Sequence, residues 1–157
     1  MTTINVEING KLKELSVNIN EKLLDVLRRY GYKSVHKGCN QGECGACVVM
    51  LNGKPVNSCM VPVMRTDGAK IETVEGIGTM DNPHPIQTAM VETGGVQCGF
   101  CTPGFVVSGA ALLKEKASPT MDEIKRATDG NLCRCTGYVK KLEGIQLAAK
   151  RMKGGKK

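Results

Sequence analysis

Eight cysteines in 157 residues constrain this chain more than any other feature. They form two groups of four with different spacing, one group in each half of the chain. Each half has roughly 75 to 80 residues, a size at which a hydrophobic core alone is marginal and small folds often recruit a metal. Because cytosolic thiols stay reduced, such groups are typical of metal ligands rather than disulfides. We therefore expect a cofactor in both halves.

The first cysteine group has the plant-type ligand spacing of a [2Fe–2S] cluster. It reads C-x4-C-x2-C, followed by eleven residues and a fourth cysteine: Cys39, Cys44, Cys47 and Cys59. Three thiolates on one short loop would surround a di-iron core, and the fourth would arrive from the next hairpin. Sharp turns in this loop require positive φ angles and room for amide N–H groups to approach sulfur. The glycines that meet this need are Gly38, Gly42 and Gly45.

The second cysteine group reads C-x2-C, thirty-one residues, then C-x-C: Cys98, Cys101, Cys133 and Cys135. Its spacing alone fits a tetrahedral zinc site as well as an iron–sulfur cluster. Cys101 and Cys135 each precede a predicted helix, and helix N-termini stabilise the negative charge of an iron–thiolate centre. This position favours iron and leaves zinc open.

Alternating apolar residues and two Asn-Gly turns predict two β-hairpins in the first half of the chain. A short apolar helix is expected between the hairpins, with a capping residue before it and a glycine after it. The expected elements are hairpins over residues 4–19 and 48–59, a helix between the Asn20 cap and Gly31, and a last strand over 71–74.

The second half of the chain is predicted to be helical. Residues 76–83 are rich in Gly, Asp, Asn and Pro, and beyond them the apolar period changes from two towards 3.6. We therefore expect two domains, over residues 1–77 and 78–157. The four predicted helices cover residues 85–94, 103–113, a short segment capped by Thr120 and Glu123, and a segment from near Thr136 to Ala149.

The net charge of +7 comes mostly from the end of the chain. Five of the 22 basic residues lie in residues 150–157, a stretch without acidic residues: Lys150, Arg151, Lys153, Lys156 and Lys157. Such a stretch is typical of a solvated, mobile tail, and we assign it no function.

The sequence favours a cytoplasmic location without membrane attachment. Its first residues alternate like a strand and lack the charged and apolar regions of an export signal. No stretch approaches the ~20 apolar residues of a membrane span.

Four segments of the chain resemble the small iron–sulfur subunit of the molybdenum hydroxylases, the family of xanthine dehydrogenase, aldehyde oxidoreductase and aerobic carbon monoxide dehydrogenase. The segments are Lys37–Cys47, His84–Gln87, Gln97–Gly104 and Asn131–Tyr138. They occur in the family's order, and the resemblance covers about residues 3 to 150. It implies an α+β fold, in which an N-terminal β-grasp plant-type ferredoxin domain precedes an all-α four-helix [2Fe–2S]-binding domain.

The resemblance also implies the cofactors and partners. A molybdopterin, expected in its cytosine dinucleotide form, would lie in a large partner subunit near the second cluster. FAD would lie in a medium subunit facing the first cluster, and neither nucleic acid nor membrane is an expected partner. Gln97 matches the position whose carboxamide contacts the pterin, a group that suits a heterocycle because it both donates and accepts hydrogen bonds.

Two positions depart from the family pattern, at His36 and in the pair Lys140-Lys141. A lysine is commoner before Lys37, and an apolar residue is usual at the second position of the pair. We expect these departures to affect only the surface and helix packing. Arg134, between two cysteines, is interpreted either as a surface ion-pairing residue or as a charge that makes the nearby cluster easier to reduce.

The function favoured by the sequence is electron transfer within a molybdenum hydroxylase. The chain lacks the fingerprints of a dinucleotide site, a P-loop and a nucleophile elbow, so the substrate chemistry is expected on a partner. Purines, nicotinate-like heterocycles, aldehydes and carbon monoxide all fit this reading. The alternatives are a free-standing two-cluster ferredoxin and a zinc-stabilised nucleic-acid module. With no Trp, three Tyr and two Phe, the chain has few rings for base stacking, which disfavours the last.

Overall fold

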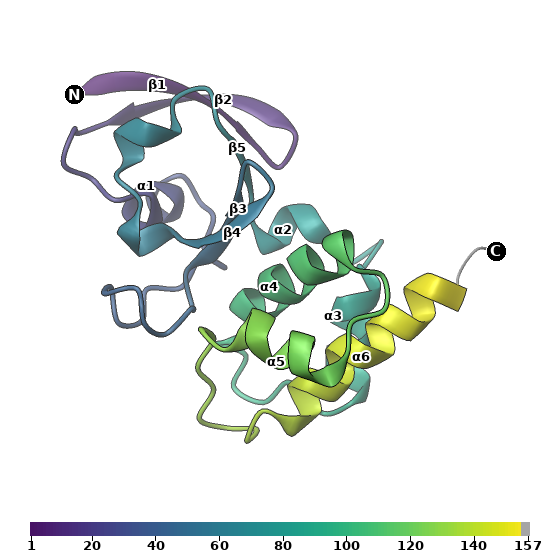
Figure 1. The fold of residues 1–157 in the computed structure, drawn as a ribbon. Coiled ribbons are helices and arrows are strands. Elements are labelled where there is room, and N and C mark those ends of the chain that lie inside the picture. The colour runs from purple at the N-terminus through teal and green to yellow at the C-terminus, as the bar shows by residue number, and fades with distance from the viewer. Residues whose placement is uncertain (155–157) are drawn as a thin grey trace.

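The computed structural model describes residues 1–154 and divides them between two lobes (Figure 1). The first lobe is a five-stranded mixed sheet with a short α-helix and two 3-10 turns. Its elements are β1 (Thr2–Ile8), β2 (Lys11–Val17), α1 (Leu23–Arg29), β3 (Val48–Leu51), β4 (Lys54–Asn57), η1 (Ser58–Met60), η2 (Val63–Thr66) and β5 (Lys70–Glu72). The strand order is β2-β1-β5-β3-β4, in which β1 and β5 are parallel and the other neighbours antiparallel.

The sheet buries one face against α1, as the alternation of apolar residues predicts. Strands β1 and β2 turn at Asn9 and Gly10, whose φ angles of 51° and 76° both have the positive sign of a type I′ turn. The second expected hairpin is also present, as β3 and β4. The residues that fill this core from β1 and α1 are Ile4, Val6, Ile8, Leu23, Leu24, Val26 and Leu27.

The second lobe is a helical bundle. Its helices are the short α2 (Val74–Ile77), then α3 (Pro85–Glu92), α4 (Thr102–Glu115), α5 (Met121–Thr128) and α6 (Val139–Gly154). The capping box predicted at Thr120 is present, since its hydroxyl accepts from the Glu123 N–H while the Glu123 carboxylate accepts from the Thr120 N–H. Helix α4 contacts both the sheet and the other four helices, and therefore joins the lobes.

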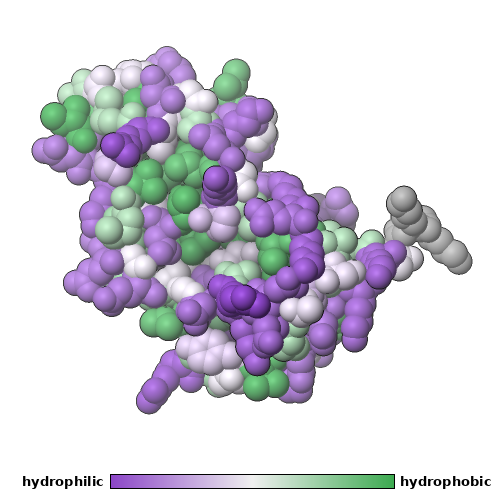
Figure 2. Space-filling model, viewed as in Figure 1, coloured by the Kyte–Doolittle hydropathy of each residue, from purple (hydrophilic) through white to green (hydrophobic). Residues whose placement is uncertain are grey.

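The two lobes share part of their core. Met50 on β3 packs with Val107 and Ala111 of α4 in one buried cluster. Figure 2 shows apolar surface continuing into the crease between the lobes. The sheet and the bundle are therefore held together by apolar contact as well as by the chain connection.

The start of α1 differs from the prediction. Helix α1 begins at Leu23, and Asn20 does not cap it. The chain turns tightly instead, since Glu21 N–H donates to the Asn18 carbonyl and the Glu21 carboxylate accepts from the Asn18 N–H. Strand β2 consequently ends at Val17, and Ile19 is exposed.

The last helix begins later than predicted. It starts at Val139 rather than near Thr136, because Gly137 and Tyr138 have φ angles of 62° and 71°, outside the helical region. The hydroxyl of Thr136 contacts the Cys133 sulfur at 3.1 Å instead. Residues 136–138, which the pattern assigned to the helix, therefore belong to the loop before α6.

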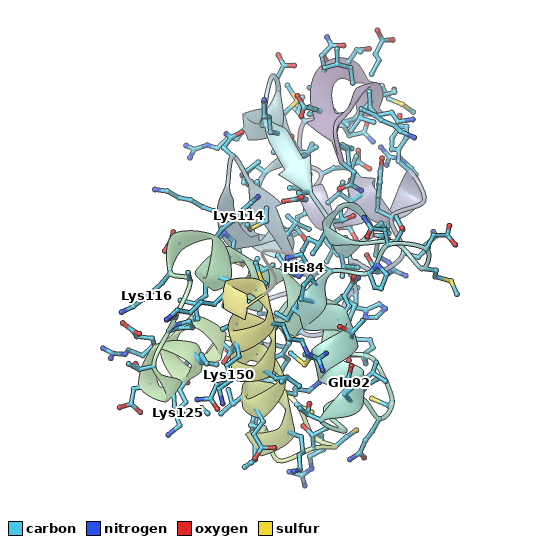
Figure 3. All side chains as sticks on the ribbon, turned by 90° about the vertical axis from the view of Figure 1, so that its right-hand side faces the viewer. His84, Glu92, Lys114, Lys116, Lys125 and Lys150 are labelled. Carbon is cyan, nitrogen blue, oxygen red and sulfur yellow. The ribbon has the colours of Figure 1, made fainter. Side chains whose placement is uncertain are left out.

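The prediction of a mobile basic tail is wrong for the described part of that segment. Residues 150–154 continue α6, which lies beside α3 (Figure 3). The Arg151 guanidinium donates to both oxygens of Glu92 on α3, at 2.8 and 2.6 Å. Lys156 and Lys157 lie outside the described residues. Within residues 1–154, no helix has the length and apolar character needed to cross a bilayer.

Met50→Ala tests the core shared by the two lobes. Met50 is 2% exposed, so we expect this change to lower the free energy of unfolding by about 2–5 kcal/mol. Met80→Ala is the matched control, because Met80 is 99% exposed and its truncation should alter stability by less than about 0.5 kcal/mol. Urea unfolding of the full chain, followed by circular dichroism, measures both, and equal effects would contradict the packing.

Candidate iron–sulfur centres

The ferredoxin-type site, formed by Cys39, Cys44, Cys47 and Cys59, lies in the loop after α1 and in η1. The loop directs backbone N–H groups at sulfur. Cys39 Sγ accepts from the N–H groups of Gln41, Glu43 and Cys44 at 3.3–3.4 Å. In return, the Cys39 N–H donates to Cys44 Sγ at 3.4 Å. The loop is therefore a preformed cradle for negative charge on sulfur.

The thiols of this site fall into two unlike pairs. The N–H groups of Gln41, Cys44 and Glu43 lower the pKa of Cys39 to about 6, which favours the metal-binding thiolate. Cys47 and Cys59 are buried, and burial together with the neighbouring Cys47 thiol raises the pKa of Cys59 to about 11. A di-iron cluster takes two thiolates on each iron, so two adjacent pairs suit it.

The three loop glycines serve two different needs. Gly42 and Gly45 have the positive φ angles that the sequence predicts, 84° and 67°. Gly38 does not, and is needed for space, because a Cβ there would lie 2.7 Å from Cys44 Sγ. A Cβ on Gly45 would lie 2.3 Å from the Gly130 carbonyl oxygen of the other lobe. Glycine at 45 therefore also permits the lobes to approach.

The helical-domain site, formed by Cys98, Cys101, Cys133 and Cys135, lies in the loops before α4 and α6. It again contains two pairs. Cys98 and Cys135 are exposed, with their Sγ atoms 3.5 Å apart. Cys101 and Cys133 form the inner pair, in which burial and the neighbouring Cys133 thiol raise the pKa of Cys101.

Backbone and hydroxyl donors also support the thiolates of the helical-domain site. The Phe100 N–H lowers the pKa of Cys98, while the hydrogen bond with Cys98 raises the pKa of Cys135. Burial raises the pKa of Cys133, but hydrogen bonds from Thr136, from the Cys135 backbone and from Cys101 together outweigh it and leave a pKa of about 7. Cys101 lies at the N-cap of α4, as predicted, whereas Cys135 lies four residues before α6. The helix-terminus argument therefore holds for one of the two cysteines.

The paired thiols of each site suit a di-iron core, because each of its two irons takes two thiolates.

The loops of the two sites touch each other. The Leu132 N–H, next to Cys133, donates to the Cys44 carbonyl at 2.9 Å. The buried Asn131 carboxamide donates to the Gly45 carbonyl at 3.1 Å. A short route of covalent bonds and one hydrogen bond therefore connects a cysteine of each candidate site.

His36 adds a third contact between the loops and corrects the expectation that it affects only the surface. Its ring stacks on Phe100, which lies between Cys98 and Cys101, with the ring centroids 4.7 Å apart. Its Nδ1 lies 2.7 Å from the Phe100 carbonyl oxygen. His36 thus helps to fix the position of one site relative to the other.

Lys141 is the residue whose environment the sequence analysis misread. It is buried inside the bundle, where its ammonium donates to the Gly95 carbonyl at 2.7 Å, whereas we expected an effect on packing alone. The spacing along the helix predicts this burial, because Lys141 lies four residues before the buried Ile145 and therefore on the same face of α6. Arg134 and Gln97 are both exposed, and Arg134 makes no ion pair with the described residues.

Comparison with known families matches both halves of the chain to iron–sulfur models. Residues 6–72 match a 2Fe-2S iron-sulfur cluster binding domain, and residues 73–146 match a [2Fe-2S] binding domain. The second match decides between iron and zinc for the helical-domain site in favour of iron.

Individual relatives agree with these models. The chain is 43% identical over 150 residues to the nicotinate dehydrogenase small FeS subunit of Eubacterium barkeri, covering 95% of this chain and 96% of that one. Quinoline 2-oxidoreductase from Pseudomonas putida 86 contains a chain with a TM-score of 0.93 and 34% identity, covering 98% of this chain and 97% of that one. The aldehyde oxidoreductase of Desulfovibrio desulfuricans has a TM-score of 0.96 and 42% identity, over 98% of this chain and 17% of that one.

Cysteine substitutions test the independence of the two sites. We expect the purified chain to bind about four irons and about four sulfides in two spectroscopically distinct centres. Cys59→Ser should remove only the ferredoxin-type signal, and Cys98→Ser only the helical-domain signal, because no cysteine is shared. Iron analysis and EPR after dithionite reduction measure this, and loss of both signals from either change would contradict it.

Gly45→Ala tests the close approach of the lobes. A Cβ at this position meets the Gly130 carbonyl, so we expect reduced iron in the ferredoxin-type site and loss of at least about 2 kcal/mol of stability. Gly53→Ala is the matched control, because Gly53 has a similar φ of 83° but nothing within 4 Å of an added Cβ. If the two variants retain equal iron and stability, the approach is not required.

Proposed function

The chain belongs to the family of small iron–sulfur subunits of the molybdenum hydroxylases, and from this premise we propose that it relays electrons from a molybdopterin-binding large subunit to an acceptor. Its two [2Fe–2S] domains give it an electron-transfer role. The acceptor we propose is FAD in a medium subunit. We propose two domains over residues 1–77 and 78–157, in which α2, at the end of the first, packs on the helices of the second. We propose all eight cysteines as ligands: Cys39, Cys44, Cys47, Cys59, Cys98, Cys101, Cys133 and Cys135.

The contact between the site loops is the observation that carries this proposal. Each [2Fe–2S] cluster, when bound, takes up and returns a single electron. The hydrogen bond from the Leu132 N–H to the Cys44 carbonyl joins the backbones that present a ligand of each site. The stacked pair of His36 and Phe100 holds the same two loops in place. A chain built to pass electrons between two centres requires such a fixed, short separation.

The exposed side of the helical-domain site supports docking of a partner there. Cys98, Cys135 and Gln97 are exposed, so this site reaches the protein surface. Large apolar side chains that neighbour these ligands in sequence are exposed as well: Val96, Phe100, Leu132, Tyr138 and Val139. Exposed apolar groups around a functional centre are typical of a protein interface. We propose that this face meets the large subunit and that the Gln97 carboxamide contacts its pterin.

In this proposal, the partner subunit determines which substrate the enzyme oxidises. The relatives are named for nicotinate, quinoline and aldehyde, and this chain is 34–43% identical to all three. A chain of the same fold thus serves enzymes with unlike substrates. We propose that the molybdopterin is in its cytosine dinucleotide form, that the complex is cytoplasmic, and that nucleic acid is not a partner.

A free-standing two-cluster ferredoxin is the second candidate. The exposed thiols Cys98 and Cys135 favour this candidate, because a mobile electron carrier also needs an accessible centre. A tagged chain purified from its native source separates the two candidates. The relay subunit should co-purify with a large chain that contains molybdenum and with FAD, whereas a chain recovered alone, without molybdenum, would overturn the proposal.

Gln97→Ala tests the proposed face in the purified complex. Loss of one hydrogen-bonding group towards the pterin should slow reduction of the clusters by substrate about tenfold. Iron content should stay unchanged because Gln97 is not a ligand. Nicotinate, xanthine and benzaldehyde serve as reducing probes, and stopped-flow absorbance follows the clusters.

Gln41→Ala is the matched control for this experiment. Gln41 is also an exposed glutamine beside a ligand, but it lies in the ferredoxin-type loop. Its truncation should leave the rate of reduction by substrate unchanged. Equal rates for Gln97→Ala and the unmodified complex would limit Gln97 to a packing role.

A further inference from the structure

A lysine lies in the interior of the helical bundle without a carboxylate partner. Lys141 on α6 is 1% exposed and is among the largest fully buried side chains. No Asp or Glu in residues 1–154 lies within ion-pair distance of its ammonium. A buried charge is costly unless another charge compensates it. The bundle therefore needs a source of negative charge near this side chain.

The contacts of the Lys141 ammonium lead to the helical-domain site. Its Nζ donates to the Gly95 carbonyl at 2.7 Å and lies 4.9 Å from the centroid of the Phe105 ring. Gly95 lies three residues before Cys98, and Phe105 lies four residues after Cys101. The carbonyl and the ring are neutral, so the negative charge in this environment is that of the iron-bound thiolates.

The ferredoxin-type site has a different lysine nearby. The Lys22 ammonium donates to the carbonyl and carboxamide oxygens of Asn40, next to Cys39, at 3.1 and 3.3 Å. Lys22 is half-buried, whereas Lys141 is 1% exposed. Because water screens the more exposed charge, Lys141 acts more strongly on its site than Lys22 does on the ferredoxin-type site.

We propose that Lys141 is a buried cation that raises the reduction potential of the helical-domain cluster relative to the ferredoxin-type cluster. Reduction adds one electron to the cluster, taken from an external donor, and increases its negative charge by one. A fixed positive charge in a poorly polarisable interior stabilises that reduced form more than the oxidised form. The exposed Arg134 is screened by water and has a weaker effect.

This tuning gives the helical-domain cluster the greater affinity for the first electron. Its consequence for electron entry from the large subunit rests on the proposed function, whereas the difference in potential between the clusters does not. Lys141 acts on the cluster only by placing a positive charge near its ligands, and it is therefore not a catalytic residue.

An EPR-monitored reductive titration of the full chain with both clusters tests the proposal. Lys141→Met removes the charge and the hydrogen bond, whereas Lys141→Gln removes the charge and retains an N–H donor for Gly95. Each variant should shift the distribution of one electron between the two clusters at least tenfold away from the helical-domain cluster. For a one-electron couple, a tenfold shift corresponds to a difference in potential of 59 mV. The ferredoxin-type cluster serves as the internal reference.

Lys140→Met is the matched control. Lys140 is the neighbouring lysine, but it is exposed and pairs with Glu143 at 3.0 Å. Loss of the same formal charge at this solvated position should change the equilibrium less than twofold. An unchanged equilibrium in Lys141→Met, a normal one in Lys141→Gln, or an equal shift in Lys140→Met would each overturn the proposal.

A second measurement applies if the Lys141 variants do not retain clusters. In the chain without iron, neither a carboxylate nor an iron-bound thiolate compensates the ammonium, so Lys141→Met should raise the melting temperature of the apo chain above that of the unmodified apo chain. A lower melting temperature would overturn the proposal. Recovery of the chain without molybdenum would instead remove the proposed function and leave the potential shift intact.

Discussion

Negative charge gathered on four sulfur atoms at each site is the constraint on which the rest of this structure depends. The ferredoxin-type site meets it with backbone N–H groups, which the tight loop directs at Cys39 and Cys44. The helical-domain site has fewer such donors and uses a helix N-terminus at Cys101 together with the Lys141 ammonium. The same electrostatic problem therefore has two solutions in one chain, and the solutions differ in the charge that they place beside the cluster.

The approach of the two loops then determines how the lobes are built. A side chain at position 45 would clash with the other lobe. The buried Asn131 carboxamide donates a hydrogen bond to the Gly45 carbonyl. Met50 of the sheet packs in the same core cluster as residues of α4, the helix whose N-cap is Cys101. Packing, glycine placement and hydrogen bonding all reduce the freedom of one site relative to the other. Because electron transfer depends steeply on separation, rigid joining is the property that this function requires.

The features that the sequence predicts well are local ones. The hairpins follow from residue alternation and Asn-Gly turns, and the capping box at Thr120 follows from residues three apart. The helix starts at Asn20 and Thr136 were wrong because a turn or a site loop takes those residues. Cysteine spacing predicted that each half of the chain binds a [2Fe–2S] cluster, and both halves match such domains. It did not reveal that Lys141 and His36 meet the loops, because those contacts arise from packing.

The departure at Lys141 shows where a conserved fold leaves room for adaptation. Relatives named for unlike substrates share this architecture at 34–43% identity. The potential of each cluster can vary, because one buried side chain changes it without moving a ligand. Replacement of an apolar residue by lysine costs free energy in the apo chain and recovers it only when the cluster is present. A charge at this position therefore couples the stability of the bundle to the cluster that it tunes.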